Sequence, residues 1–166
     1  MTKEPSGNPI INFLYLQVVT TLANMAGNAA CRPDIQSIDG VGFLLAMLDT
    51  QVVDTQLSQA ELLAAERVQK KSAIALSRLC NDPTVCRDVL RLGGIDRLVE
   101  LCKHPAERSA SDAVLVACLA VLRRLKTNLG SEVGEVLCSL NADDLVQPKL
   151  VDSFVEHSAA KQESYV

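Results

Sequence analysis

The chain has 166 residues, of which 48% are hydrophobic and 3% aromatic, and its formal net charge at pH 7 is −4. This length can bury one core of ordinary size, and an apolar but aromatic-poor composition favours packed helices over a β-sandwich. The negative charge argues against general nucleic-acid binding, which needs a positive surface facing the phosphates. No apolar run approaches the ~20 residues of a membrane span, so no insertion into a membrane is expected.

The first predicted helix follows a polar N-terminal segment. Residues 1–9 contain two prolines and a glycine and lack the apolar core of a signal peptide, so we expect a linker there. A helix is predicted near residues 10–27, because Tyr15, Val18, Leu22 and Met25 recur at helical spacing on one face.

A second long helix is predicted over residues 58–80, after a polar insertion at 49–56. Ser58 and Glu61 stand at the spacing of a capping box, in which each satisfies a backbone N–H of the other. The helix ends at Asn81-Asp82-Pro83, where Asp82 suits the N-cap of a new helix and proline suits its first position.

The segment after this break predicts two shorter helices around a glycine corner. The first carries Val85, Val89 and Leu92 as its expected apolar face. Gly93-Gly94 should end it, because glycine adopts the left-handed cap conformation without steric cost. The next helix runs from Ile95 to Cys102.

A third long helix is predicted near residues 110–126, with Ser109 as a candidate N-cap. A shorter helix follows around residues 133–140. The last predicted helix closes the core with four apolar residues, Leu150, Val151, Phe154 and Val155. Residues 156–166 are expected to form a disordered, flexible tail.

These elements repeat. A shift of 54 residues places Leu22 on Leu76, Gly40 on Gly94 and Ile38 on Leu92 without a gap, and a further shift of 46 places Leu76 on Leu122. Helical units at a near-constant period are typical of an α-solenoid, in which each unit stacks on its neighbours.

The repeated residues resemble the armadillo-repeat family. The likeness rests on Leu22-x-Asn24-Met25 followed by Asp39-Gly40-Val41, and on Gly93-Gly94-Ile95-x-x-Leu98-Val99-x-Leu101 in the second copy. It implies an all-α fold: a right-handed α-solenoid of armadillo-like three-helix repeats over residues 10–155, with a C-terminal capping helix. Since the first helix aligns with the third helix of a repeat, we expect the chain to be the C-terminal piece of a longer protein.

We find no pattern of an active site, so we expect no enzyme, no cofactor and no metal site. The two histidines, His104 and His157, have no nucleophile at an interpretable position. The six cysteines lie mostly among apolar helix residues and are expected to be core residues in a reducing compartment, and no Cys-x-x-Cys occurs. An enzyme with an unrecognised site remains the weakest alternative.

The armadillo resemblance implies a peptide-binding groove. In that family an asparagine on the concave face bonds the backbone of an extended peptide, and Asn24 matches it. The aligned residues in the later copies are Arg78 and Arg124, which depart from the family pattern and would suit a carboxylate. The family's groove tryptophans are absent, which argues against capture of basic import signals. The alternative is that both arginines are solvated surface charges.

The chain ends in Glu163-Ser164-Tyr165-Val166. A serine two residues before an apolar residue with a free carboxylate fits the pattern of ligands for PDZ domains. The four residues are therefore predicted to form a PDZ-binding motif.

Together, the helical repeats, the insertion and this ending resemble the Inscuteable family of adaptors of asymmetric cell division, whose members end in Glu-Ser-aromatic-Val. The resemblance implies a non-enzymatic cytoplasmic scaffold at the apical cell cortex that helps to orient the mitotic spindle. Its implied partners are a PDZ domain of a Bazooka-type polarity scaffold and a Pins-type adaptor, the latter through a segment nearer the N-terminus.

A second class of function stays open. The chain suits a generic armadillo regulatory subunit, such as an exchange-factor or chaperone adaptor, that binds a folded globular partner. The tail distinguishes the two, because such a subunit does not need a free Val166. The sequence does not identify the groove ligand, the oligomeric state or the PDZ domain.

Overall fold

The computed structural model describes residues 9–50 and 57–147, and this part of the chain is helical without any β-strand. Its α-helices are α1 (Pro9–Ala26), α2 (Arg32–Ser37), α3 (Gly40–Leu48), α4 (Gln59–Leu79), α5 (Pro83–Arg91), α6 (Gly94–Lys103), α7 (Asp112–Leu129) and α8 (Ser131–Ser139). Three 3-10 helices connect or follow them: η1 (Ala29–Cys31), η2 (Pro105–Arg108) and η3 (Asp143–Val146).

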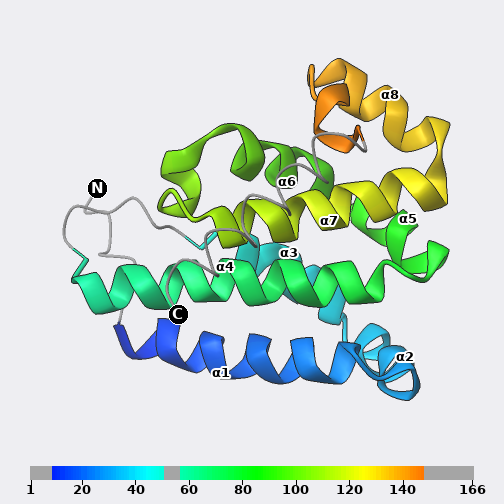
Figure 1. Cartoon of the computed structure of the whole chain (residues 1–166). Coiled ribbons are helices and arrows are strands. Elements are labelled where there is room, and N and C mark those ends of the chain that lie inside the picture. Colours follow the sequence, from blue (N-terminus) through cyan, green and yellow to red (C-terminus); the bar gives the residue numbers. More distant parts are fainter. Residues whose placement is uncertain (1–8, 51–56, 148–166) are drawn as a thin grey trace, which may run out of the picture.

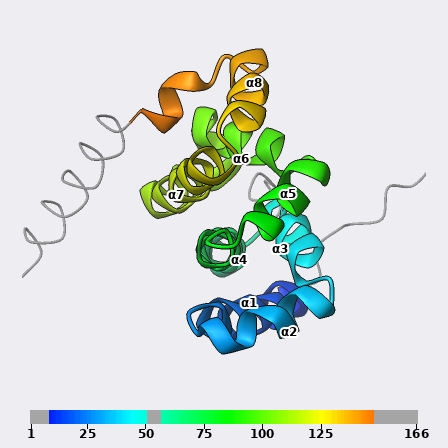
Figure 2. The ribbon, with the colours of Figure 1, turned by 90° about the vertical axis from the view of Figure 1, so that its right-hand side faces the viewer.

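The three long helices α1, α4 and α7 lie side by side and run in the same direction, with α4 in the middle (Figure 1). A short helix follows each of them at the same end of the stack: α2 after α1, α5 after α4 and α8 after α7. Helices α3 and α6 then return behind the stack, as the end-on view in Figure 2 shows. One long helix followed by two shorter ones therefore occurs twice, and the order begins a third time with α7 and α8.

Helix starts follow the sequence signals in two of three predicted cases. Ser58 accepts the N–H of Glu61 while the Glu61 carboxylate accepts the N–H of Ser58, which completes the capping box of α4. Asp82 accepts the N–H of Thr84 at 2.8 Å and caps α5. The prediction of Ser109 as a cap was wrong: Ser111 caps α7, because Ser109 ends η2 in the left-handed conformation with φ 51°.

The predicted glycine corner joins α5 to α6. Gly93 has φ 73°, which a β-carbon would disfavour. Gly94 lets Leu45 pack closely on the corner, since a β-carbon there would lie 2.6 Å from Cδ2 of Leu45 and that side chain would have to shift. The equivalent corner between α2 and α3 uses Asp39 at φ 55° and then Gly40, and aspartate is among the residues that tolerate this conformation best.

The core lies between the long helices and the returning ones. Leu76 and Leu122, which the repeat predicted at its centre, are both fully buried. The largest fully buried aliphatic side chains are Ile35, Leu44, Leu48, Leu76, Leu79, Ile95, Leu98, Leu101, Leu122, Leu125 and Leu137.

Three apolar residues that the sequence placed on packing faces are exposed in the structure. Val18 is 45% exposed, and the face of α1 that packs on the other helices is centred on Val19, Ala23 and Ala26 instead. Ile38 and Leu92 are 70% and 44% exposed, because each is the C-cap residue of a short helix and points away from the core at the corner.

Several sequence predictions fall outside the described residues. They concern the linker at 1–8, part of the insertion at 51–56, the closing helix after Gln147 and the tail at 156–166. Among the helices that are described, none combines the length and hydropathy of a membrane span.

Candidate binding surface

The predicted groove residues occupy the same end of the three long helices. Asn24 lies near the C-terminus of α1 and is exposed, whereas Arg78 of α4 and Arg124 of α7 are half-buried. The aligned positions thus come together in space, one on each helix of the stack.

The two arginines each bond a group of the preceding layer of the stack. Nη1 of Arg78 donates to the backbone oxygen of Ala23 on α1. Nη1 of Arg124 donates to Oδ1 of Asn81, whose Nδ2 in turn donates to the backbone oxygen of Arg78 at 3.1 Å. The guanidinium groups therefore help to hold α1, α4 and α7 in register, a role that the sequence did not predict.

A further set of cations lies along the outward side of α4. Arg67 is exposed and Lys70 and Lys71 are half-buried, on the same side of the helix as Arg78. Within the described residues, no hydrogen bond or ion pair engages these three side chains. We call Arg67, Lys70, Lys71, Arg78 and Arg124 the basic row.

Among the residues that the structure describes, acidic groups are scarce on this side of the stack. Helix α1 has no charged residue at all. The two acids of α4 are occupied elsewhere: Glu61 closes the capping box, which lowers the pKa of its carboxyl group, and Glu66 accepts the hydroxyl of Ser111 at 2.6 Å. The basic row therefore gives one face a positive charge although the whole chain is negative.

The spacing of these cations in the sequence indicates the basic row, although the sequence motifs did not predict it. Residues 67, 70, 71 and 78 are spaced as one helix face, and of these four cations only Arg78 was assigned to the groove, because it aligned with the family asparagine. Grouping the charged residues by helix face, rather than by their position in the repeat, predicts the basic row.

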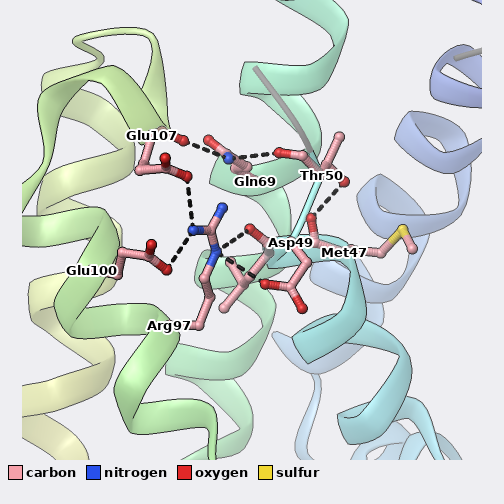
Figure 3. A network of polar contacts seen from close by, with 8 residues as sticks. Met47, Asp49, Thr50, Gln69, Arg97, Glu100 and Glu107 are labelled. Carbon is pink, nitrogen blue, oxygen red and sulfur yellow. Dashed lines mark hydrogen bonds and ion pairs between the residues drawn. The ribbon is translucent and has the colours of Figure 1, made fainter. Parts of the chain in front are cut away.

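A separate network of hydrogen bonds and ion pairs connects the end of α3 with α4, α6 and η2, and it forms no reactive site (Figure 3). Arg97 on α6, whose side chain is only 14% exposed, donates from Nε to the backbone oxygen of Leu48 at 3.0 Å and pairs with Asp49 at 3.1 Å. Its Nη1 bonds Glu100 at 2.8 Å and Glu107 at 3.0 Å. Burial would lower the pKa of Arg97, but these two carboxylates outweigh it and raise the pKa, so the guanidinium stays charged.

Gln69 completes the network from α4. Its Nε2 donates to the backbone oxygens of Thr50 and Glu107, both at 2.9 Å, and the residue is fully buried (Figure 3). Together with Arg97 it anchors the end of α3 and Glu107 of η2 against α4 and α6. The arrangement is structural, since each of its charged groups already has a partner.

Two buried thiols and a shallow cleft lie apart from this network. Cys80 and Cys86 are fully buried, and contact with Cys86 together with burial raises the pKa of the Cys80 thiol well above its ordinary value. A shallow cleft of about 380 Å³ lies between α2 and the start of α5, lined by Ala29, Arg32, Pro33, Gln36, Asn81, Asp82 and Pro83. The described residues contain no cluster of three metal-ligating side chains.

The predicted PDZ-binding residues Glu163, Ser164, Tyr165 and Val166 lie outside the described residues. The PDZ-binding motif therefore stays a prediction from the sequence.

Comparison with known proteins decides the family. Residues 12–166 match the family described as "Protein inscuteable C-terminal". The chain belongs to the Inscuteable C-terminal family. Two relatives named "Protein inscuteable homolog", from Mus musculus and Homo sapiens, are each 47% identical to it over 139 residues, or 84% of the chain.

The match covers 23% of the length of each of these Inscuteable homologues, so most of each relative lies beyond the region compared. No solved structure matches the chain. Membership of the Inscuteable C-terminal family therefore rests on sequence.

Proposed function

We propose that the chain is a non-enzymatic adaptor of asymmetric cell division that acts in the cytoplasm at the apical cell cortex and helps to orient the mitotic spindle. Membership of the Inscuteable C-terminal family supports this role. It would hold two partners, one on the outward face of the long helices and one at the C-terminal tail. Contact with a Pins-type adaptor would use a different segment of the longer family members.

The fold proposed for this role is an armadillo-like solenoid. The repeated order of one long and two shorter helices, the parallel stack of α1, α4 and α7 and the two glycine corners support it. In such a solenoid the outward side of the long helices forms the concave groove.

The observation that carries the groove proposal is the basic row. Five cations lie on the outward side of two adjacent helices, and three of them have no hydrogen-bond or ion-pair partner among the described residues. Such a row favours a peptide with acidic side chains, because carboxylates paired with arginine form short charge-assisted hydrogen bonds. The amide of Asn24 on the neighbouring helix would bond the peptide backbone, as its aligned family position does.

The test uses charge reversal on α4. In the double variant Lys70→Glu, Lys71→Glu, a fluorescent peptide rich in Asp and Glu should bind about tenfold more weakly, because each reversal replaces an attraction with a repulsion of a fraction of a kcal/mol or more. Binding by the native chain should also weaken as salt is raised. Fluorescence anisotropy measures both effects.

The matched control is Arg87→Glu, Arg91→Glu, which changes the net charge equally on exposed positions of α5. An equal loss in both variants would show that only net charge matters, and unchanged binding in the α4 variant would return the row to solvated surface charge. Either result contradicts the groove proposal.

The tail would bind a PDZ domain of a Bazooka-type polarity scaffold. A PDZ domain adds such a peptide as an extra strand, with the carboxylate of Val166 in a nest of backbone N–H groups and the Ser164 hydroxyl bonded two residues before it. Glu163 and Tyr165 would make rim contacts. Small interfaces of this kind are weak, so we expect a dissociation constant on the order of 1 µM.

Calorimetry of the last ten residues against PDZ domains of polarity scaffolds tests this. A single glycine added after Val166 moves the carboxylate away from its nest and should remove binding. If the extended peptide binds as well as the native one, the carboxylate is not recognised and the tail proposal is wrong.

A further inference from the structure

The basic row runs along one helix rather than across the stack. Four of its five cations, Arg67, Lys70, Lys71 and Arg78, are on α4, and Arg124 alone is on α7. From Arg67 to Arg78 the row covers about 16 Å of the axis of α4, because an α-helix rises about 1.5 Å per residue. A ligand that contacts most of these cations therefore lies along α4, which is the middle helix of the stack (Figure 1).

The spacing of the row suits a helical ligand. Arg67, Lys71, Ile74 and Arg78 follow one another at intervals of four, three and four residues, and all but the exposed Arg67 are half-buried. Two helices that pack along their length contact each other at these intervals, because both have the same rise per residue. An extended chain would pass the same distance in about five residues, of which only alternate ones would face α4. A helix can therefore face more of the row than an extended chain can.

The helices on either side of α4 are uncharged beside the row. Helix α1 has no charged residue, and the 54-residue shift places Phe13, which is 49% exposed, at the position of Arg67. Between Asp112 and Arg123, α7 also has no charged residue, and its positions aligned with the row hold alanine and valine. This surface has a cationic centre between two uncharged sides. The ligand face that complements it has an acidic stripe with uncharged residues on either side.

We propose, building on the groove proposal, that the basic row binds an α-helix of a partner protein that lies along α4 and carries such an acidic stripe. Its Asp or Glu residues recur at intervals of four, three and four, as the residues of α4 do. The acid that faces Ile74 reaches Lys70, which lies one turn earlier on α4. Backbone groups of a helix are free only at its ends, so Asn24 would bond the end of the partner helix nearest to it.

Two fluorescent peptides of about 20 residues test the spacing, since shorter isolated helices are marginal in water. The stripe peptide has four Glu residues at intervals of four, three and four in a background of alanine and glutamine. The permuted peptide has the same composition, with its four Glu residues spread around the helix. The native chain should bind the stripe peptide about tenfold more tightly, because only this peptide presents all its acids to one face. Fluorescence anisotropy measures both affinities.

A proline in the middle of the stripe peptide tests the conformation. Proline in a helix interior removes a hydrogen bond and disrupts the helix, whereas an extended ligand tolerates it better. The proline variant should therefore bind at least about tenfold more weakly than the stripe peptide. Circular dichroism of the native chain mixed with the stripe peptide should also show more helix than the two separate spectra added together.

A charge exchange at Arg67 tests the lengthwise alignment. Arg67→Glu should weaken binding of the stripe peptide several-fold, because it replaces an attraction with a repulsion. Lysine in place of the Glu at one end of the stripe should restore binding, and lysine at the other end should not, since only one end faces position 67. Arg87→Glu, which changes the same charge on an exposed position of α5, is the matched control and should show no such restoration. Circular dichroism checks that each variant is folded.

Three results would overturn the helical ligand and leave the groove proposal standing. The permuted peptide could bind as tightly as the stripe peptide, the proline variant could bind unchanged, or both end substitutions or neither could restore binding to Arg67→Glu. A different result would contradict the groove proposal itself: no acidic peptide binds the native chain at about 1 mM, the weak limit of a specific complex. The two failures are thus distinguishable.

Discussion

Asp82 lies between the end of α4 and the start of α5, and its side-chain carboxylate caps α5. The hydrogen bond from the backbone N–H of Thr84 lowers the pKa of this carboxyl group more than burial raises it, and contacts with Gln36 and Arg87 also lower it. A lowered pKa in the folded state means that the group stabilises the fold when it is ionised. This contribution is present above the unfolded pKa of about 3.9 and is lost as the pH falls through the folded value.

We therefore predict that Asp82→Ala lowers the free energy of unfolding by about 1 kcal/mol at pH 7, the usual cost of losing an N-cap. The difference from the native chain should shrink below about pH 4 as the native carboxylate becomes protonated. Urea unfolding at several pH values measures this.

Asp82→Asn serves as the control, since asparagine keeps the cap oxygen without a titrating group. It should be nearly as stable as the native chain at pH 7, with a weaker pH dependence. A constant difference between Asp82→Ala and the native chain from pH 3 to 7 would mean that the charge of the cap does not contribute.

The hydrogen-bond partners of the arginines could not be predicted from the sequence. Alignment brought Arg78 and Arg124 to one end of the stack, but nothing in the sequence indicated that Ala23 and Asn81 would be their partners. The contacts of Arg97 and Gln69 were equally hidden, because Arg97 bonds Leu48 across 49 positions of the chain. Polar partners depend on how helices pack, and a periodic pattern does not encode that.

At the scale of elements, the sequence predicted best the helices whose ends carry a local signal. The capping residues Ser58 and Asp82 and the Gly93-Gly94 corner set boundaries within a few residues of those observed. The packing face of α1 was predicted less well. Since α1 is apolar on both its inner and outer sides, helical periodicity alone cannot distinguish Val18 from Val19.

The middle position of α4 leads to a prediction about its core residues. Leu76→Ala should lower the free energy of unfolding by roughly 2–5 kcal/mol, and Leu122→Ala on α7 by a similar amount, because both side chains are fully buried and leave a cavity. Leu63→Ala on the same helix as Leu76 should cost less than about 1 kcal/mol, as it is 46% exposed.

Chemical denaturation followed by circular dichroism compares the three variants. A loss below about 1 kcal/mol for Leu76→Ala would indicate that the region relaxes to fill the cavity and that the stack is less tightly packed than its burial suggests.

At the scale of the whole molecule, an adaptor must hold its partners at the same time. The two proposed binding surfaces differ in chemistry: the basic row lies on α4 and α7, and the PDZ-binding residues Glu163 to Val166 come at the end of the chain, beyond the last described residue, Gln147. They share no residue and use different groups, one set of side-chain cations and one terminal carboxylate. Binding at sites without shared contacts is expected to be additive within about 0.5 kcal/mol.

The last prediction is therefore that the two surfaces act independently. Removing residues 163–166 should abolish binding of the PDZ domain and leave the affinity for the acidic peptide unchanged. Lys70→Glu, Lys71→Glu should do the reverse, and the native chain alone should form a ternary complex with both ligands, measured by size-exclusion chromatography with light scattering. If either change weakens both ligands, the two surfaces form one site or the variant has lost its fold, which circular dichroism distinguishes. A folded variant that loses both would contradict the bridging role, because one ligand would then exclude or require the other.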